Sequence, residues 1–330
     1  MTHDGTVTVL IPAYEAAGFI DRTLGLARAQ TYENQRILVS VDRSADETEE
    51  ICRGHAGQDD RIEVVNQPER LGWAGNVNFL LDTVRSEFCF LYFHDDRIEP
   101  TYSERLLSAL RRRPDAASAH CDMGHFGEGA GKLSPGRALD GPDAVRLLDF
   151  LTAEGKPSLL RSMLRSELAA DIRMPTAGGG VWANQPFLMG LVAAGPAVHV
   201  PETLYLRWNK RGGGLTDAWR SLPFEEILAG YRENAEAGLA VIDGLRATAP
   251  ERELLELGLR VHLMLRLRGA EIRYGENDVT PAEALHPRLA GADAPEALAA
   301  LDPALRAQCE DGLSRLERRT KRARRKLARK

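Results

Sequence analysis

Two adjacent acidic residues, Asp95 and Asp96, directly follow the apolar segment 88–93. Carboxylate oxygens are the ligands that hard divalent cations prefer, and a bound Mg²⁺ or Mn²⁺ can neutralise a diphosphate. The alternative is structural, because a solvated Asp pair can cap the helix that we expect to begin near Pro100. The doublet therefore indicates either a divalent-cation site or a helix cap.

Asp42 is a second candidate, since it stands at the end of the apolar segment 37–41. An exposed carboxylate at a strand end can accept a hydrogen bond from the imide N–H of a nucleobase. The residues after it have a simpler interpretation, because Ser44, Asp46 and Thr48 are types that cap a helix. We therefore treat Asp42 as a candidate binding residue and the others as caps.

The elements that must position these residues alternate regularly over the first 121 residues. Strands of four to six residues separated by helices of ten or more predict an α/β fold with a mostly parallel sheet flanked by helices. Ligands gather at the carboxyl edge of such a sheet, so the segments that follow the strands should surround one crevice. The expected strands are 7–11, 37–41, 62–65, 88–93 and 116–119, the helices lie near 16–30, 45–55, 73–85 and 100–113, and the crevice segments are 12–15, 42–44, 66–78 and 94–96.

The remainder of the chain is less regular and becomes helical toward its end. Six glycines between residues 122 and 141 predict a mobile loop. We expect the α/β body to give way to a helical C-terminal extension between residues 212 and 222. Beyond the loop, the pattern predicts helices at 142–152, 185–194, 223–245 and 251–268, extended segments at 197–200 and 203–207, and a long charged stretch from residue 303.

Composition excludes several classes of protein. The 330 residues are 43% apolar and 28% charged, which is typical of a globular chain and not of a disordered or collagen-like one. The four cysteines form no CxxC pair, which favours reduced thiols in the cytoplasm and no structural zinc site. We expect no signal peptide, and the apolar stretch 187–200 is too short to span a bilayer.

Charge is distributed unevenly along the chain. Residues 318–330 contain nine Lys or Arg and no acid, so the preceding residues carry 34 basic against 48 acidic side chains, or −14. This acidic body argues against nucleic acid as a partner. The basic tail is either a solvated end or a peripheral contact with an anionic membrane surface, at the inner face of the membrane for a cytoplasmic protein.

Five segments in this order and spacing resemble the nucleotide-sugar-dependent glycosyltransferases of family 2, which have a GT-A fold. The resemblance is clear over residues 7–110 and weaker over 158–216. Val41 and Phe93 stand where two of the family motifs begin with Asp, and Glu15 stands where Asn is usual. The segments are Val-Thr-Val-Leu-Ile-Pro-Ala-Tyr-Glu (7–15), Ala-Gln-Thr-Tyr (29–32), Val-Asp-Arg-Ser-Ala-Asp-Glu-Thr (41–48), Gly-Trp-Ala-Gly-Asn-Val-Asn (72–78) and Tyr-Phe-His-Asp-Asp-Arg-Ile-Glu-Pro (92–100).

The resemblance implies a GT-A-like domain over residues 1–215, with a nucleotide-binding half (1–121) and an acceptor half (122–215). Residues 216–330 would be a helical region that ends in the basic tail. The implied reaction moves a sugar from a nucleoside-diphosphate donor, UDP-sugar by default, to a hydroxyl acceptor. That acceptor would be a saccharide, a lipid-linked molecule or a small molecule. Mn²⁺ or Mg²⁺ would assist, and configuration would be inverted.

The resemblance also assigns roles to individual residues. Tyr14 would pack against the nucleobase, Asp42 would accept from its imide nitrogen, and Asp96, with Asp95, would hold the metal. Lys210 and Arg211, beside the glycines 212–214, suit either a lid that closes on the diphosphate or a basic surface loop. Asn184 would meet the acceptor, and Trp182 either offers the acceptor a stacking face or is a buried packing residue. The complete set of implied nucleotide contacts is Pro12, Tyr14, Glu15, Asp42, Arg70, Asn78 and Asp95.

The catalytic base is the missing part of this pattern. An inverting transferase needs a carboxylate to take the proton of the acceptor hydroxyl, but the family's base position falls at or beside Asn184. No carboxylate occurs between Asp171 and Glu202. Either one of those two acids serves, or the enzyme retains configuration and the departing phosphate takes the proton. The third alternative is a catalytically silent protein that binds sugar nucleotides or acts as a scaffold.

Overall fold

The computed structural model describes residues 5–152, 159–169, 171–209, 214–274 and 280–290, together with Pro303, Ala307, Ser314, Arg315 and Arg318. The chain divides into two compact units. The segments of the two units alternate along the chain, so these units do not correspond to a single division at residue 215. That division, predicted from the sequence, stays a prediction. The first unit comprises Met1–Ala138, Pro157–Met174 and Gly195–Asp217, and the second comprises Leu139–Lys156, Pro175–Ala194 and Ala218–Lys330.

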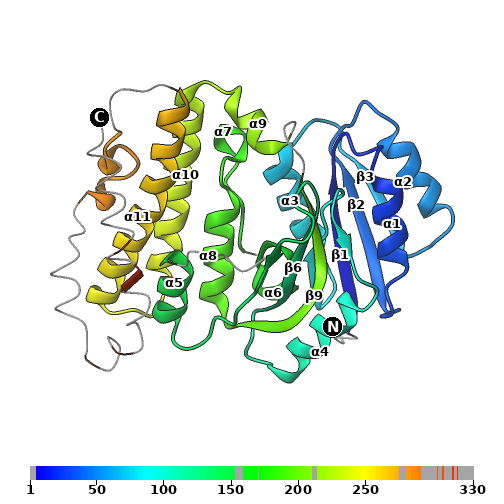
Figure 1. Ribbon diagram of the computed structural model, residues 1–330, viewed down its shortest axis with the longest axis horizontal. Coiled ribbons are helices and arrows are strands. Elements are labelled where there is room, and N and C mark those ends of the chain that lie inside the picture. Colours follow the sequence, from blue (N-terminus) through cyan, green and yellow to red (C-terminus); the bar gives the residue numbers. More distant parts are fainter. Residues whose placement is uncertain are drawn as a thin grey trace. The chain divides into compact units, whose positions relative to one another are not determined.

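The first unit holds all the strands of the described chain (Figure 1). Its strands are β1 (Val7–Ala13), β2 (Gln35–Val41), β3 (Ile62–Asn66), β4 (Phe88–Leu91), β5 (Arg97–Ile98), β6 (Ser118–Gly127), β7 (Leu133–Ser134), β8 (Met163–Arg165) and β9 (Ala197–Asn209). Its helices are α1 (Ile20–Arg28), α2 (Thr48–Ala56), α3 (Gly72–Thr83), α4 (Tyr102–Arg112), the 3-10 helix η1 (Leu159–Arg161) and α6 (Ser166–Ala169).

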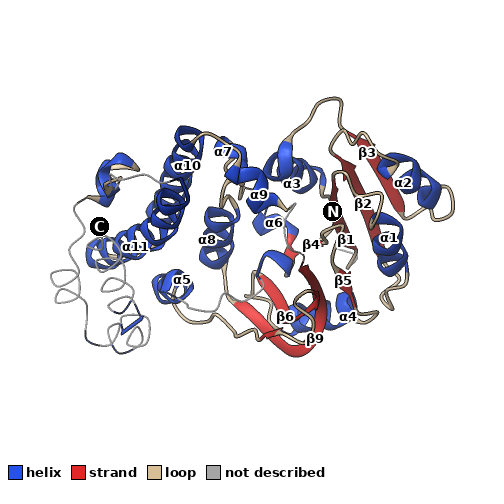
Figure 2. Cartoon of the chain, turned by 45° about the horizontal axis from the view of Figure 1, so that its top comes forward, coloured by secondary structure: helices blue, strands red, loops and turns tan. Residues whose placement is uncertain are grey.

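The strands form one mixed sheet in the order β3-β2-β1-β4-β8-β6-β9-β5, with β7 paired to β6. The strands β3, β2, β1 and β4 run parallel to one another, whereas β8 is antiparallel to both β4 and β6. Figure 2 shows α3 on the opposite side of the parallel strands from α1 and α2. This follows from right-handed crossovers, since the chain moves outward through β1, β2 and β3 and then returns to β4.

The predicted parallel strands are confirmed because their sequences suit burial on both faces. All seven residues of β1 are buried, and only Arg36 of β2 is exposed. Because the sequences of these strands are apolar on both faces, both sides of the sheet must be covered by helices. The register aligns Ala13 at the end of β1 with Val41 at the end of β2. The residues that follow these two strands therefore start at the same edge of the sheet.

The prediction of a mobile loop at residues 122–141 is wrong for its first part. Residues 122–127 continue strand β6, which pairs with β9 from Ser118 through Gly127. Pairing with β9 satisfies the backbone of these residues and outweighs the poor strand propensity of glycine. A Cβ at Gly124 would lie 2.6 Å from the Leu206 side chain, so close strand approach explains that glycine.

The second unit is helical, and α10 and α11 lie side by side in it (Figure 1). The predicted helices 142–152, 185–194, 223–245 and 251–268 are confirmed as α5, α8, α10 and α11. The unit contains α5 (Asp143–Thr152), α7 (Ala177–Gly180), α8 (Asn184–Ala194), α10 (Phe224–Asp243), α11 (Ala249–Tyr274), η2 (Ala282–Ala284) and η3 (Pro287–Leu289), while α9 (Leu215–Arg220) spans the boundary between the units. The charged stretch from residue 303 lies almost entirely outside the described residues.

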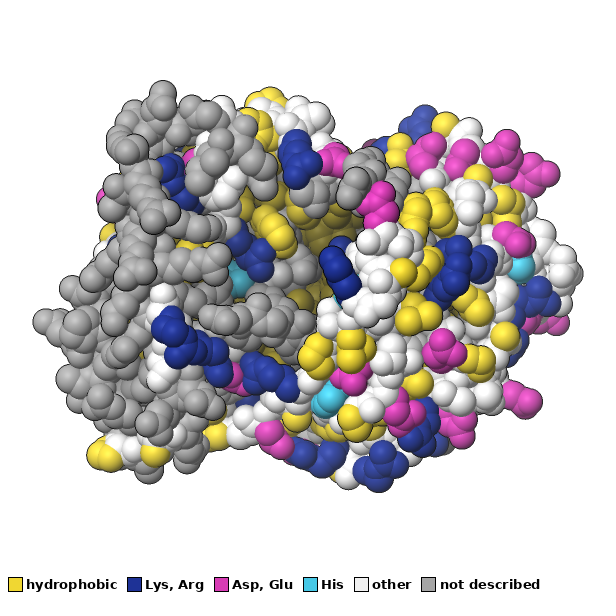
Figure 3. All heavy atoms as spheres, viewed as in Figure 1, with side chains coloured by type: hydrophobic (Ala, Val, Ile, Leu, Met, Phe, Trp, Pro, Cys, Tyr) yellow, Lys and Arg dark blue, Asp and Glu magenta, His cyan; other side chains and the backbone are white. Residues whose placement is uncertain are grey.

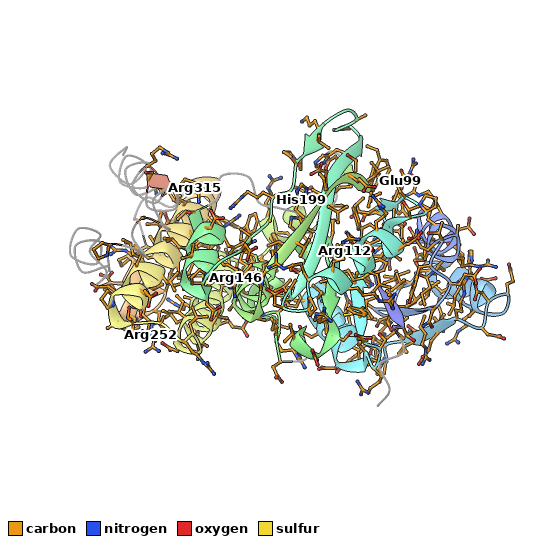
Figure 4. All side chains as sticks on the ribbon, turned by 90° about the horizontal axis from the view of Figure 1, so that it is seen from below. Glu99, Arg112, Arg146, His199, Arg252 and Arg315 are labelled. Carbon is orange, nitrogen blue, oxygen red and sulfur yellow. The ribbon has the colours of Figure 1, made fainter. Side chains whose placement is uncertain are left out.

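A buried arginine ties α5 to the end of α8. Arg146, labelled in Figure 4, donates from Nε to the carbonyl of Val192 at 3.1 Å and from a terminal nitrogen to that of Ala193 at 3.2 Å. Its Nη2 is also 2.8 Å from Asp143. A cation at the C-terminal end of a helix satisfies carbonyls that the helix leaves unpaired.

Among the described residues, none of these helices is both long and apolar enough to cross a bilayer.

A buried histidine in β6 gives the first unit a testable response to acid. His120 is fully buried, and burial together with neighbouring His199 lowers its pKa to about 3. Below the unfolded-state pKa of about 6.5, the unfolded chain takes up a proton that the folded chain refuses, so stability falls as pH falls. At pH 5 this difference is about 2 kcal/mol. Urea denaturation of His120→Phe should show that much less loss between pH 7 and pH 5 than the wild type.

Val200→Ala on β9 is the matched control, because it removes buried apolar volume near His199 without changing any titratable group. It should lower the free energy of unfolding equally at both pH values. If His120→Phe loses as much stability between pH 7 and pH 5 as the wild type, the assignment of acid sensitivity to His120 is wrong.

Candidate functional site

The loop after β1 and the loop after β2 are joined by hydrogen bonds. The backbone N–H of Glu15 donates to the Ser44 hydroxyl at 3.0 Å, and the Glu15 carboxylate accepts from the Ala45 N–H at 2.9 Å. Glu15 has a left-handed φ of +46°, which this double contact holds in place. The structure thus gives Glu15, predicted as a nucleotide contact, a role in fixing the two loops.

The capping residues after β2 also reach across to α1. The Thr48 hydroxyl accepts from the Ala16 N–H at 2.8 Å, and Asp46 accepts from the Ala17 N–H at 2.9 Å. Burial opposes ionisation of Asp46, but its hydrogen bonds to Thr48 and Ala17 outweigh that effect and lower its pKa. The N-cap of α2 is Glu47, which makes no side-chain cap hydrogen bond, so the capping prediction is wrong in its simple form. Thr48 and Asp46 instead hold the backbone of the segment that precedes α1.

Tyr14, Asp42 and Arg70 lie together at the edge of β1 and β2. The Arg70 guanidinium carbon is 3.3 Å from the centre of the Tyr14 ring, and its Nε is 3.9 Å from Asp42 Oδ2. Asp42 is buried, and its Oδ1 accepts from the Leu71 N–H at 2.6 Å. The predicted base-binding residues are therefore brought together. Arg70 lies on the ring face that a nucleobase would need.

Asp96 is a buried carboxylate with protein partners on both oxygens. Oδ2 accepts from Arg161 Nε at 3.0 Å and from the Tyr205 hydroxyl at 2.8 Å, while Oδ1 accepts from the Trp208 N–H at 2.8 Å. Burial alone would lower the pKa of Arg161, but the Asp96 charge outweighs it and raises that pKa. These hydrogen bonds use three of the roughly four acceptor positions of the carboxylate, so Asp96 holds the structure together, and its predicted role as a metal ligand stays a prediction.

Asp95 is the carboxylate that fits a divalent cation. It is half-buried, and burial and then the neighbouring charge of Asp96 raise its pKa. A cation there would relieve the cost of holding two carboxylates close together. Among the described residues, no three His, Cys, Asp or Glu side chains gather so as to hold a metal by themselves. Diphosphate oxygens would therefore have to complete the coordination, as is usual for Mg²⁺.

His94 occupies the position between the end of β4 and the acidic doublet. Its Nδ1 lies 3.0 Å from the carbonyl oxygen of Pro12, and its own carbonyl accepts from the Thr23 hydroxyl at 2.6 Å. The Pro12 carbonyl, predicted to contact a nucleotide, is thus bonded to His94. Sequence reasoning missed both His94 and Arg161. The place of His94 beside Asp95 was a visible signal, whereas Arg161 lies in no recognisable motif.

Three other predicted residues of the first unit lie in different surroundings. Asn78 exchanges two 2.9 Å hydrogen bonds with the backbone of Met174, so it fixes that segment. Asp171 is exposed, and Glu202 bonds to Arg105 of α4. Arg105 Nε donates to the Glu202 carboxylate at 3.0 Å, so the structure engages Glu202 in an ion pair with α4.

The predicted acceptor residues belong to the second unit. Trp182 has a left-handed φ of +53°, with the Arg266 guanidinium carbon 3.9 Å from the centre of its ring and the Trp219 ring centre at 5.9 Å. Asn184 begins α8. The predicted lid residues Lys210 and Arg211 lie outside the described residues.

Residues 8–150 match the model of the family described as Glycosyl transferase family 2. Over this segment, which is less than half of the chain, the sequence is similar to glycosyl transferase family 2. The family predicted from the sequence motifs is thereby confirmed. The matched segment contains the ends of β1, β2 and β4, which Tyr14, Asp42 and Asp95 follow.

Two characterised relatives illustrate the similarity. Glycosyltransferase GlyA of Streptococcus pneumoniae is 32% identical over 110 residues, which are 33% of this chain and 16% of the relative. The GalNAc(5)-diNAcBac-PP-undecaprenol beta-1,3-glucosyltransferase of Campylobacter jejuni is 27% identical over 152 residues, 45% of this chain and 48% of the relative. The matches thus span less than half the length of these two relatives.

Solved structures extend the similarity in fold over nearly the whole chain. TarS residues 1–349 of S. aureus, in complex with UDP-GlcNAc, superposes with a TM-score of 0.70 at 16% identity, covering 96% of this chain and 92% of TarS. The mannosyltransferase PcManGT of Pyrobaculum calidifontis, in complex with GDP-Man and Mn²⁺, gives 0.50 at 18% identity, with 96% and 86% covered. The predicted GT-A-like α/β fold with a helical C-terminal region is confirmed.

The ion pair between Arg161 and Asp96 should contribute strongly to stability, because both partners are removed from solvent. Arg161→Met leaves the Asp96 carboxylate buried without its cation, which should cost about 3–5 kcal/mol of unfolding free energy. Urea denaturation measures this loss. Arg173→Met is the control, since Arg173 pairs with Asp82 at the surface and should lose less than about 1 kcal/mol. Equal losses in the two variants would contradict a special role for Asp96.

Proposed function

We propose that this family 2 protein transfers a sugar from a nucleoside-diphosphate donor to a hydroxyl acceptor with the help of a divalent cation. The observation that carries the proposal is the register of the parallel strands. It aligns the ends of β1 and β2, and it pairs Leu10 of β1 with Leu91 of β4. Tyr14, Asp42 and Asp95 therefore follow neighbouring strands at one edge of the sheet, where such folds bind ligands.

The end of this edge at Tyr14 and Asp42 is where we propose that the nucleobase binds. It suits a base that carries a ring N–H donor. Asp42 Oδ1 accepts from the Leu71 N–H, whereas Oδ2 lies 3.9 Å from Arg70 Nε, beyond hydrogen-bond distance. That oxygen can accept from the imide of uracil or thymine, or from the ring N–H of guanine. Cytosine and adenine present a lone pair instead and would be repelled. UDP-sugar remains the default donor, and Arg70 would have to leave the Tyr14 ring for the base to stack there.

The diphosphate end is built around Asp95. A bound Mn²⁺ or Mg²⁺ would offset the negative charge that develops on the leaving diphosphate. Asp95 supplies one carboxylate ligand, while Asp96, held by Arg161, keeps the turn in place. Arg22 of α1 donates to the Asp95 carbonyl at 3.1 Å and adds positive charge to the same loop. PcManGT, which was solved with GDP-Man and Mn²⁺, has a similar fold.

The acceptor side of the proposal is broader. The Campylobacter jejuni relative is named as acting on an undecaprenol-linked saccharide, which supports a lipid-linked acceptor beside a saccharide or small molecule. Trp182 and Asn184 are the residues we propose to meet that acceptor. Within the same proposal, Lys210 and Arg211 would close on the diphosphate, and residues 318–330 would touch the inner face of the cytoplasmic membrane.

A second function is favoured by one observation, the amide at Asn184. An amide can orient an acceptor hydroxyl, but it cannot take its proton. If no other group does so, the protein would bind sugar nucleotides without transferring the sugar. A retaining reaction, in which the departing phosphate takes the proton, would not need a base at Asn184.

Slow hydrolysis of the donor separates these alternatives. We expect the protein with Mn²⁺ to release UDP from a UDP-sugar, because water can replace the acceptor in an active site. Asp95→Asn should lower the release at least tenfold, whereas Asp82→Asn on the surface of α3 should not change it. Nucleotide binding without release from any of several UDP-, GDP- and dTDP-sugars would favour the silent binding protein.

Asp42→Asn should change the base preference. The new amide can keep the Leu71 hydrogen bond through its oxygen and present an N–H to the base. It should therefore weaken UDP binding by about 10–100-fold and reduce the discrimination against CDP, since a hydrogen bond to a charged group is worth about 1.5–3 kcal/mol. Calorimetric titration with UDP and CDP in Mn²⁺ measures both effects. An unchanged UDP affinity would exclude Asp42 as the base contact.

A further inference from the structure

We propose that His94 binds a ribose hydroxyl of the donor through its Nε2 atom. His94 would thereby select among nucleotide sugars by the hydroxyls of their ribose. This inference rests on the proposed function, because it assumes that a nucleoside diphosphate occupies the edge of β1, β2 and β4. It concerns a residue that lies in the motif segment 92–100 but to which the sequence analysis assigned no role.

The first step is the protonation of the ring. The Pro12 carbonyl oxygen can only accept a hydrogen bond, so Nδ1 of His94 carries the proton that is shared at 3.0 Å. In a neutral imidazole the other nitrogen then carries a lone pair and acts as an acceptor. Within the described residues, Nε2 of His94 has no hydrogen-bond partner, and this atom is not fully buried. A ligand can therefore reach it. A hydroxyl donor suits it.

The second step is the orientation of the ring. In the ladder between β1 and β4, the Tyr92 N–H donates to the Leu10 carbonyl. The next carbonyl of β1 in that direction is Pro12, and it accepts from the His94 side chain. The Thr23 hydroxyl holds the His94 carbonyl at 2.6 Å from the α1 side. The imidazole is therefore fixed at both its ring and its backbone, which lowers the entropy cost of using it in binding.

The third step is the position of the ring along a nucleotide. His94 is bonded to Pro12, two residues before Tyr14, and it directly precedes Asp95. Tyr14 belongs to the base end of the proposed site and Asp95 to the diphosphate end. In a nucleoside diphosphate, the ribose is the part that joins the base to the phosphates. A residue that connects the two ends of the site therefore faces the ribose.

The chemistry of the neighbouring residue agrees with this placement. Phe93 stands where the family motif begins with Asp, and its ring lies 4.8 Å from the Arg161 guanidinium carbon. Phe93 has no side-chain acceptor to offer a ribose. His94, the next residue, supplies one in the same turn.

The test compares UDP with its 2′-deoxy and 3′-deoxy forms in Mn²⁺ by calorimetry. The wild type should bind the deoxy form that lacks the contacted hydroxyl about 3–10-fold more weakly, as expected for one neutral hydrogen bond. In His94→Phe that penalty should fall to less than twofold. The hydroxyl whose penalty disappears is the one that His94 binds. If it is the 2′ hydroxyl, thymidine diphosphate donors, which lack that hydroxyl, should bind about 3–10-fold more weakly for this reason.

The ratio of the two affinities within each variant corrects for any change in folding. His94→Asn provides a second variant, because its amide can still donate to the Pro12 carbonyl. His55→Phe on α2, which removes an imidazole paired with Asp21, is the matched control and should keep the wild-type ratio. Unchanged penalties for both deoxy forms in His94→Phe and His94→Asn would overturn the proposal. Failure of the wild type to bind UDP at all would instead refute the proposed function.

Discussion

The buried carboxylate of Asp96 is the interaction on which the rest of the site depends. It joins the turn after β4 to η1 through Arg161, and to β9 through Tyr205 and the backbone of Trp208. A carboxylate removed from water is stable only with such complete pairing. The same pairing fixes the turn that carries Asp95. Within the acidic doublet, Asp96 therefore holds the structure, and Asp95 is the residue that we propose for the chemistry.

Holding Asp95 beside the charged Asp96 has an electrostatic cost, which binding of a cation would offset. Asp95 stays half-buried beside a second negative charge, and the pKa of Asp95 rises as a consequence. At the other end, Arg70 lies on the face of Tyr14 next to the buried Asp42. A nucleoside diphosphate with its cation would satisfy both ends at once. On the visible face of the first unit, by contrast, basic and acidic side chains are interspersed and can neutralise each other (Figure 3).

Much of the fold was predictable from the sequence, because the parallel strands and their helices depend on local apolar patterns. The strand ends at Asp42 and Asp95 followed from the same patterns. The extension of β6 was not predictable, since its glycine-rich sequence is stabilised by pairing with β9, some 80 residues later. Arg161 was missed for the same reason. Its partner lies 65 residues away in the sequence, and only the folded chain brings them together.

The most direct test of this account is a crystal structure of the protein grown with Mn²⁺ and UDP. We expect manganese to lie on the Asp95 carboxylate and on both phosphates, with uracil against Tyr14 and Asp96 still paired with Arg161. A nucleotide bound elsewhere, or Asp95 turned away from an empty edge of the sheet, would contradict the account.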